Sequence, residues 1–402
     1  MTTRPTALVL TPRTPWPLDD GGRIVAWQSV DTAGREHDVV LVTFDAPAAI
    51  GVPEPDFVRA ACRSVVRIPH RPAGALAAAL RGSFGRWPHT MVRFHSAEYA
   101  AAVRDAVRTF RPAFAVVNHL HLAVYADDLG DTPWALREHN VEHLWMARYA
   151  ATLRDPVTRA YARFQAGRLR RFERDAACRA TIVFAIHEAE ARELRRLAPE
   201  ARVEVVPVGI DFTRYPEPDP ASPPVVLVVG SFAYAPNVEG LRRFVAEGAA
   251  ELRRLAPSAI LRVAGRGIEP GLARELRAAG VDVVGAVPDM APQFAEATVV
   301  LVPLWFGAGA RVKIVEAAAA GVPVVSTPLG AEGLGFAPRE DILIAEEPVE
   351  LARLAAALVS DPERARALGA RAHALAGERY ELAGVAERTN RLCASIARKD
   401  PA

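Results

Sequence analysis

The sequence predicts an α/β protein with two doubly wound, Rossmann-like domains. Short apolar runs such as 7–10, 225–229 and 299–302 alternate with longer helical segments, a pattern typical of parallel sheets. The first βαβ unit carries a glycine pair, Gly21-Gly22, where its helix starts. A proline-rich stretch at 216–224 separates the two series of elements and is typical of a linker.

Composition narrows the class of protein. The 402 residues are 50% hydrophobic and 24% charged, which is ordinary for a globular protein with two sizeable cores. A net charge of +2 argues against a general nucleic-acid binder. The three cysteines form neither a metal spacing nor a disulfide framework. The first apolar run is too short for a signal peptide, and no stretch approaches the roughly 20 apolar residues of a membrane span. We therefore expect a cytoplasmic enzyme.

The stretch 299–334 carries the clearest site signal. A buried strand at 299–302 is followed by a loop of small residues, a helix at 310–320 and a second strand at 322–326. Backbone N–H groups and the helix dipole suit a phosphate there. Arg311, in the first turn, offers forked donors, Lys313 adds a point charge, and Glu316 suits sugar hydroxyls. The alternative is a solvated basic face on which Glu316 pairs with Lys313.

The run Glu316-Ala-Ala-Ala-Ala-Gly-Val-Pro-Val-Val, followed by Gly330-Ala-Glu-Gly-Leu334, resembles the signature of retaining glycosyltransferases of family 4, which have the GT-B fold. It is similar to the branch found in bacterial polysaccharide and secondary-metabolite clusters, where Arg-x-Lys precedes this segment. The family pattern has two glutamates eight positions apart. Here Glu316 is the second, whereas Ala308 stands in place of the first. Arg311 and the backbone N–H groups of 307–310 are expected to replace part of that missing glutamate.

The resemblance implies two domains that face a cleft, and a C-terminal helix that crosses back to the first domain. We expect an acceptor-side domain at 1–215, a nucleotide-sugar domain at 216–380 and the returning helix at 381–402. No phosphate-binding Arg or Lys follows Gly230, which makes Arg311 and Lys313 the better cations. The implied donor-binding residues are Gly21, Gly22, Gly230, Ser231, Val287, Gly307, Ala308, Gly309, Ala310, Arg311, Lys313 and Glu316.

A polar cluster marks the N-terminal half. His139, in the segment 137–143, matches the family's histidine that meets the donor sugar, and a neutral imidazole can both donate and accept hydrogen bonds. His119 and His121 follow an earlier strand, and no third metal ligand is evident in the sequence. An acceptor pocket or a plain loop is the expected role of that segment. The expected acceptor-side residues are Arg23, His119, His121, Glu138, Asn140 and Glu142.

Two other segments leave alternatives open. The stretch 69–88, rich in proline, arginine and glycine, is expected to be a long connection. The region 144–177 is expected to be a long helix with eight arginines between 148 and 174. That helix is either solvated, which we favour, or a basic surface with weak peripheral contact to acidic lipids or an anionic acceptor.

We therefore expect transfer of a sugar from a nucleoside-diphosphate sugar to a hydroxyl or amine, with His139, Arg311 and Lys313 in catalytic roles. The acceptor is a small molecule, a lipid-linked molecule or a glycan. No cofactor or metal is expected, since the cations and the helix take the metal's role and no Asp-x-Asp motif precedes a donor site. The alternatives are a non-hydrolysing nucleotide-sugar epimerase of the same fold and a catalytically silent accessory subunit that binds the nucleotide sugar.

Overall fold

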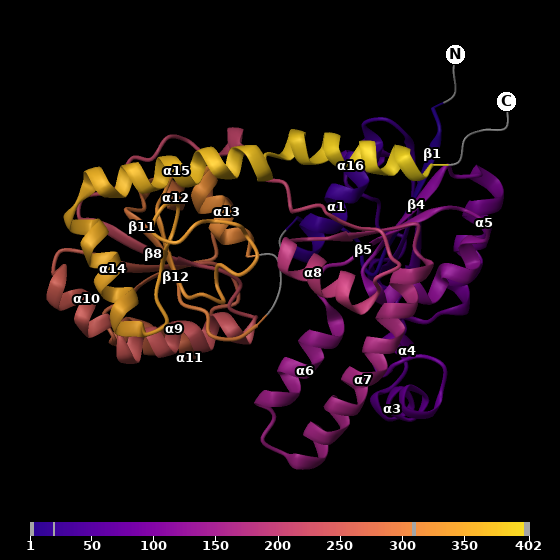
Figure 1. Cartoon of the computed structure of the whole chain (residues 1–402), viewed down its shortest axis with the longest axis horizontal. Coiled ribbons are helices and arrows are strands. Elements are labelled where there is room, and N and C mark those ends of the chain that lie inside the picture. Colours follow the sequence, from indigo (N-terminus) through magenta and orange to yellow (C-terminus); the bar gives the residue numbers. More distant parts are fainter. Residues whose placement is uncertain (1–3, 19–20, 308–310, 398–402) are drawn as a thin grey trace. The chain divides into compact units, whose positions relative to one another are not determined.

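The computed structural model describes residues 4–18, 21–307 and 311–397, and it divides into two compact units (Figure 1). Met1–Val208 together with Ala386–Ala402 form unit 1, and Gly209–Val385 form unit 2. The boundaries expected from the sequence were 215 and 380. Each unit has its own parallel sheet, so each is described by itself.

Unit 1 is built on seven parallel strands in the order β3-β2-β1-β4-β5-β6-β7. The strands are β1 (Thr6–Thr11), β2 (Asp38–Asp45), β3 (Cys62–Pro69), β4 (Phe114–Asn118), β5 (Trp134–Arg137), β6 (Ile182–Ala185) and β7 (Val203–Val205). The first helices are α1 (Gly21–Gly34), η1 (Pro47–Ala49), α2 (Asp56–Ala61), α3 (Ala75–Phe84), α4 (His89–Phe94) and α5 (Ala97–Phe110). The later ones are η2 (Leu120–Leu129), α6 (Glu142–Thr152), α7 (Pro156–Arg179) and α8 (Glu188–Leu197).

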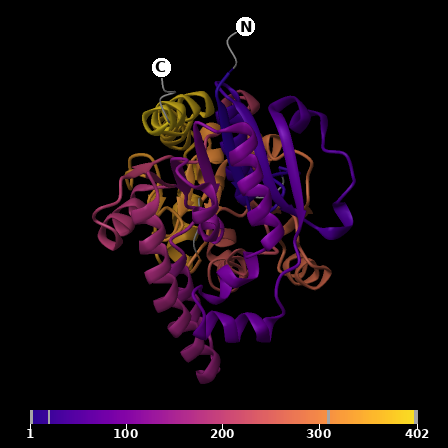
Figure 2. The same ribbon diagram turned by 90° about the vertical axis from the view of Figure 1, so that its right-hand side faces the viewer.

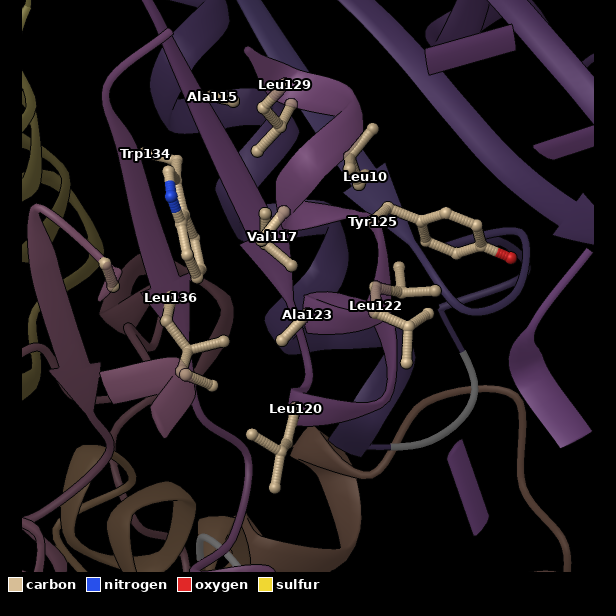
Figure 3. Close-up of a cluster of buried hydrophobic side chains, with 14 of the residues drawn as sticks. Leu10, Ala115, Val117, Leu120, Leu122, Ala123, Tyr125, Leu129, Trp134 and Leu136 are labelled. Carbon is tan, nitrogen blue, oxygen red and sulfur yellow. The ribbon is translucent and has the colours of Figure 1, made fainter. Parts of the chain in front are cut away.

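The central strands of unit 1 are buried along their length because helices flank the sheet (Figures 1 and 2). One core lies between β1, β4, β5 and the 3-10 helix η2, whose Leu120, Leu122 and Tyr125 fill the space beside Leu10 and Val117 (Figure 3). Tyr125 also accepts a hydrogen bond from the backbone N–H of Ser96 at 2.8 Å. This core fixes the segment that follows β4, where two of the candidate histidines lie.

The helical region expected at 144–177 is two helices rather than one. Asp155 caps the second of them, with its carboxylate accepting a hydrogen bond from the backbone N–H of Thr158 at 2.6 Å, and Pro156 is the first helical residue. An Asp-Pro pair is a strong signal for a helix start because proline needs no intrahelical N–H partner there. The stretch 69–88 is also different from the expectation, since it contains the ten-residue helix α3.

Unit 2 has a six-stranded parallel sheet in the order β10-β9-β8-β11-β12-β13. The strands are β8 (Val225–Val229), β9 (Ile260–Ala264), β10 (Asp282–Gly285), β11 (Val299–Val302), β12 (Val324–Ser326) and β13 (Leu343–Ile344). The helices are η3 (Phe212–Arg214), α9 (Ala235–Glu247), α10 (Ala249–Leu255), α11 (Pro270–Ala278), α12 (Ala291–Glu296), α13 (Val312–Ala319), α14 (Pro348–Ser360) and α15 (Pro362–Tyr380).

Two cores cover the two faces of this sheet. Along β8, Val226 and Val228 join the core on one face, whereas Val225, Leu227 and Val229 join the other. Figure 1 shows α9 and α11 on one side of the strands and α12, α13 and α15 on the other. A strand that is apolar at every position is therefore explained by burial on both faces.

The last helix, α16 (Leu382–Ile396), starts in unit 2, and its larger part belongs to unit 1. Within unit 1 it is tied to the end of the sheet by Arg202, which donates a hydrogen bond to Ser395 at 3.0 Å. Among the helices of the described residues, none is long and apolar enough to cross a membrane.

Candidate functional site

The strand order of unit 1 reverses between β1 and β4, and in doubly wound sheets ligands bind at the carboxyl ends of the strands at such a point. Asn118, the last residue of β4, is fully buried and fixes this edge. Its amide donates to the carbonyl of Leu10 at 3.2 Å and accepts from the Ser29 hydroxyl of α1 at 2.8 Å. The helix after β1 is thereby tied to the residues that follow β4.

His119 follows Asn118 in an uncommon backbone conformation, with φ at +79°. A non-glycine residue in this region costs energy, so the surrounding packing must hold it there. Its ring stacks on that of His121 at a centroid distance of 3.9 Å and lies 5.0 Å from that of His139. The structure thus brings together three histidines that the sequence places in two separate loops.

The three imidazoles are held neutral. Burial lowers the pKa of His119 to about 4, and the pKa values of His121 and His139 lie well below the ordinary value for the same reason. Arg13, which follows β1, lowers the pKa of both His119 and His139 further. Sequence reasoning missed Arg13, whose only signal is its place after the first strand.

The carboxyl groups beside the histidines are neutral at pH 7 as well. Burial raises the pKa of Glu142 to about 8, and burial raises the pKa of Glu138 well above its ordinary value. Glu173 of α7 raises both of them further. A protonated carboxyl group donates as well as accepts hydrogen bonds, so this cluster suits a neutral hydroxylated ligand.

Several polar atoms of the cluster have no hydrogen-bond partner within the described part of the chain: His119 Nδ1, His121 Nε2, His139 Nε2 and both carboxyl oxygens of Glu138. Buried polar atoms are normally paired, so a group of unpaired ones indicates a place for water or a ligand. Asn140, half-buried, is nearby and donates to Glu142 at 3.5 Å.

Glu142 also changes the expectation about metal ligands. With His119 and His121 it forms a set whose ligand atoms lie within 4.8 Å of one another, so a third ligand exists that the sequence did not reveal. An imidazole binds a metal in its ring plane, however, and two rings stacked at 3.9 Å and 19° cannot both aim a nitrogen at one ion without turning. The absence of a metal stays a prediction.

Gly21 and Gly22 are the first residues of α1, as the sequence indicates, and Arg23 lies half-buried in the first turn. A Cβ added to Gly21 would meet nothing within 4 Å. Packing within the protein therefore does not require glycine at this position. The helix follows β1, so its first turn belongs to the same edge of the sheet as the histidine cluster.

Unit 2 has its own reversal of strand order, between β8 and β11. Gly230 ends β8, and Asn237 of α9 and Lys313 of α13 meet at this glycine. The Lys313 amine donates to Asn237 at 2.9 Å, and a Cβ on Gly230 would lie 2.9 Å from that amine. Asn237 in turn donates to the carbonyl of Ser231 at 2.8 Å. The sequence has no cation directly after Gly230. In the structure, Lys313 of the later helix α13 supplies one at this place.

Lys313 is half-buried, and the burial of its amine together with the charge of Arg311 lowers its pKa to about 8. An anion beside the amine would favour the protonated form and offset this effect. Arg311 lies one residue before the first helical residue of α13, not in the first turn as expected, and its φ is +25°. Its guanidinium donates to the carbonyls of Leu329 at 3.4 Å and Gly307 at 3.3 Å.

Glu316 pairs with a residue that the sequence gave no reason to choose. The hydroxyl of Tyr215 donates to it at 3.1 Å, whereas Lys313 is bonded to Asn237, so the alternative Glu316–Lys313 pair is not the one formed. Burial raises the pKa of Glu316. Tyr215 directly precedes the proline-rich stretch 216–224, far from Glu316 in the sequence, and only the fold brings the two together.

The remaining donor-side residues are less constrained. Gly307 has φ at +116°, and a Cβ there would lie 2.9 Å from the Tyr234 hydroxyl, so only glycine fits. Val287 is half-buried in the loop after β10. Ala308, Gly309 and Ala310 lie outside the described residues, and so does the position where the family's first glutamate would stand.

Comparison with known families gives two matches. Residues 21–209 match the family described as glycosyl transferase 4-like domain, and residues 223–361 match glycosyl transferases group 1. Between them the two cover most of the chain. A comparison with curated proteins finds no match.

Solved structures share the fold at low sequence identity. Sucrose-phosphate synthase from Thermosynechococcus elongatus has a TM-score of 0.73 at 18% identity, over 97% of this chain and 99% of that one. HepE from Anabaena in complex with UDP has a TM-score of 0.68 at 15% identity, over 97% and 100%. WaaG, a glycosyltransferase involved in lipopolysaccharide biosynthesis, has a TM-score of 0.64 at 16% identity, over 96% and 99%. The fold of the two units is therefore that of GT-B glycosyltransferases.

Proposed function

Because this chain belongs to the glycosyltransferases that combine a 4-like domain with a group 1 domain, we propose that it transfers a sugar from a nucleoside-diphosphate sugar to a hydroxyl or amine acceptor. Structural neighbours support this class of donor: HepE has been crystallised with UDP and with UDP-glucose, and TarM with UDP and α-GlcNAc-glycerol.

The observation that carries the proposal is the position of Lys313 in unit 2. Lys313 is half-buried, and its amine lies against Gly230 at the carboxyl end of β8, within the electrostatic influence of Arg311. Two cations at one helix N-terminus are costly without an anion and favourable with one, since the helix dipole adds to their attraction. A diphosphate supplies that anion. Glu316, held by Tyr215, is placed three residues further along the helix to accept hydrogen bonds from ribose hydroxyls.

Unit 1 contributes the neutral polar cluster. His139, with unpaired Nε2, and the protonated carboxyl groups of Glu138 and Glu142 can exchange hydrogen bonds with hydroxyls of the donor sugar and of the acceptor. We assign His139 a positioning role at the donor sugar. His119, His121, Asn140 and Arg23 are assigned to the acceptor side.

Two finer features belong to the proposal. Transfer proceeds with retention at the anomeric carbon, as the family 4 resemblance implies. Transfer needs no metal, because Arg311, Lys313 and the start of α13 neutralise the leaving diphosphate. Saturating EDTA should leave the initial rate unchanged, and NMR of the product should give the same anomeric configuration as the donor.

The pH dependence of nucleotide affinity tests the donor site. Below a pKa of about 8 the Lys313 amine is charged and attracts the diphosphate, and above it the free protein holds a neutral amine. Calorimetric titration with UDP and GDP should therefore show affinity falling as pH rises from 7 to 9. Lys313→Met should bind about tenfold more weakly at pH 7 and lose this part of the pH dependence. Arg364→Met, an exposed cation on α15, serves as the control.

Two outcomes would contradict the proposal. One is wild-type affinity in Lys313→Met, which would remove the amine from the phosphate site. The other is tight nucleotide binding with no product from any nucleotide sugar across a panel of acceptors, which would leave a binding protein.

A further inference from the structure

The helix α3, found where the sequence predicted only a connection, carries an apolar stripe that no described residue of the chain covers. Leu76, Leu80 and Phe84 are 75%, 55% and 88% exposed, and their spacing of four residues places them along one face. The buried residues of the helix, Ala78 and Gly82, lie on the opposite face. Large apolar side chains that gather on one exposed face, rather than scatter singly, mark an interaction site.

This helix is firmly anchored. Gly82 packs so closely on His89 of α4 that a Cβ would lie 2.4 Å from the His89 Cα. From α7, Gln165 donates to the carbonyl of Gly82 at 3.2 Å and Arg168 donates to that of Ser83 at 2.9 Å. Figures 1 and 2 both show α3 beside α7. The apolar stripe is therefore presented outward by a fixed element.

The helix α7 also exposes large apolar side chains. Val157 and Phe164 are 76% and 48% exposed, and Arg171 continues their strip at a spacing of seven residues. Phe164 is adjacent on the helix to Gln165 and Arg168, the residues that contact α3. The helix that anchors α3 therefore exposes large apolar side chains of its own.

The segments that form this surface carry mostly positive charge. The sequence contains no Asp or Glu between residues 57 and 97, and only Asp155 between 143 and 172, whereas each of these segments has seven arginines. Some of the arginines are paired with acids from elsewhere, as Arg86 is with Asp127. Arg71, Arg81, Arg163, Arg170 and Arg171 are exposed and form no ion pair with any residue that the structure describes. Since the chain as a whole carries only +2, the positive charge is concentrated here.

We infer that α3 and the adjoining face of α7 dock on the surface of a membrane that contains anionic lipids. Leucine, valine and phenylalanine side chains enter the headgroup boundary, and the arginines pair with lipid phosphates, which is the pattern of an interfacial helix. A protein partner would need an acidic groove that fits a convex helix, whereas a lipid surface adapts to it. The inference uses none of the residues assigned to sugar transfer, so it stands apart from the proposed function.

Vesicle co-sedimentation of the full chain tests this surface. We expect binding to vesicles of phosphatidylcholine with about a third phosphatidylglycerol, weak binding to phosphatidylcholine alone, and a loss of binding on raising the salt concentration. Leu80→Ser with Phe84→Ser should weaken binding to the anionic vesicles about tenfold or more, because two apolar anchors are removed. Leu255→Ser with Val284→Ser, two exposed apolar residues of unit 2, is the matched control and should bind as the wild type does.

The contribution of the arginines is tested by the same vesicle co-sedimentation. Arg163→Gln with Arg171→Gln should weaken binding about tenfold, and Arg364→Gln with Arg366→Gln, exposed on α15, should leave it unchanged. Equal binding to both kinds of vesicle, or wild-type binding by both α3 and α7 variants, would overturn the inference. So would analytical ultracentrifugation that shows a dimer lost in Leu80→Ser with Phe84→Ser, since the stripe would then be covered by a second copy of the chain.

Discussion

The carboxyl group of Glu142 makes the stability of the protein depend on pH in a direction opposite to that of an ordinary surface acid. Its pKa is about 8 in the folded protein and 4.5 ordinarily. Between pH 4.5 and about pH 8, the Glu142 carboxyl group is protonated in the folded state and ionised in the unfolded state. The free energy of unfolding therefore falls as pH rises from about 4.5 to about 8, by up to about 1.4 kcal/mol per pH unit for one such group.

Glu142→Gln removes this effect because an amide does not ionise. Urea unfolding of wild type and variant at pH 5, 6, 7 and 8 should give a difference that shifts in favour of the variant with each step upward. The histidine cluster does not disturb the comparison: the lowered pKa of His119 removes stability only as pH falls from 6.5 toward about 4, and equally in both proteins. Glu363→Gln, at an exposed helix start, is the control. A difference constant across this range would mean that Glu142 ionises normally.

Candidate site residues could be predicted from the sequence only where they belong to a motif. His139, Glu316 and Lys313 were predicted because each belongs to a recognisable segment. The residues that act on them, Tyr215, Asn237 and Arg13, were not predicted, because the fold brings them together across a long separation in sequence. The same holds for Glu173, which bonds to Glu142. The state of protonation at the site depends on those partners and on burial, so it could not be predicted either.

At the scale of elements, the contact between α7 and the start of α6 fixes the geometry of the histidine cluster. Glu173, fully buried on α7, accepts hydrogen bonds from the backbone N–H groups of Glu142 at 2.7 Å and His143 at 3.4 Å, and it also bonds to His143 Nδ1. These N–H groups open α6, so Glu173 satisfies donors that the helix itself leaves unpaired. It thereby fixes the loop that carries His139 and Asn140.

Glu173→Gln should lower the free energy of unfolding by about 1–3 kcal/mol, because a neutral amide replaces a carboxylate at a helix start and offers one acceptor oxygen instead of two. It should also lower the pKa of Glu142, on which Glu173 acts, and so shift the pH dependence described above to lower pH. Chemical unfolding at several pH values measures both effects. Asp175→Asn, exposed on the same helix, should show neither. A loss of stability without a change in pH dependence would make Glu173 a cap only.

Strands that are buried on both faces of their sheet were the easiest elements to predict. The strands β1, β8 and β11 are close to their expected ranges because continuous apolar runs bounded by glycine and proline leave few alternatives. The interruption of the helical region 144–177 at Asp155 was missed. The helix α3 was missed because its alanines and leucines lie between proline and glycine and its apolar face is exposed rather than buried.

For the whole molecule, both sheets use the same strand order around their reversal points, yet the two edges carry opposite chemistry. The histidines and carboxyl groups clustered at the edge of unit 1 are neutral, with Arg13 beside them, whereas the edge of unit 2 holds two cations at a helix start. Uncharged groups suit sugar hydroxyls, and cations suit phosphates. The fold alone does not make this distinction, since it comes from the residues placed at each edge.

Because phosphate binding and sugar positioning are assigned to different residues, a single substitution should change either nucleotide affinity or turnover, and not both. Tyr215→Phe removes the hydrogen bond to Glu316, so calorimetry should show nucleoside-diphosphate affinity weakened about two- to tenfold, the equivalent of about 0.5–1.5 kcal/mol. Turnover at saturating donor should stay near wild type, because the proposed function places Tyr215 and Glu316 at the ribose rather than at the reacting sugar. His139→Ala should bind the nucleoside diphosphate as the wild type does and lose turnover at saturation by about tenfold or more, through poorer positioning of the sugar.

His139→Gln, which keeps a donor and an acceptor, should recover part of the lost turnover, whereas a merely structural role would not distinguish Gln from Ala at equal thermal stability. The opposite pattern would refute the division: His139→Ala with weakened nucleotide affinity and wild-type turnover, or Tyr215→Phe with intact affinity and slow turnover. Either result would place the phosphates at the histidine cluster. Such a site would have to bind an anion with imidazoles that remain neutral down to about pH 4 in the case of His119, which is why we expect the first pattern.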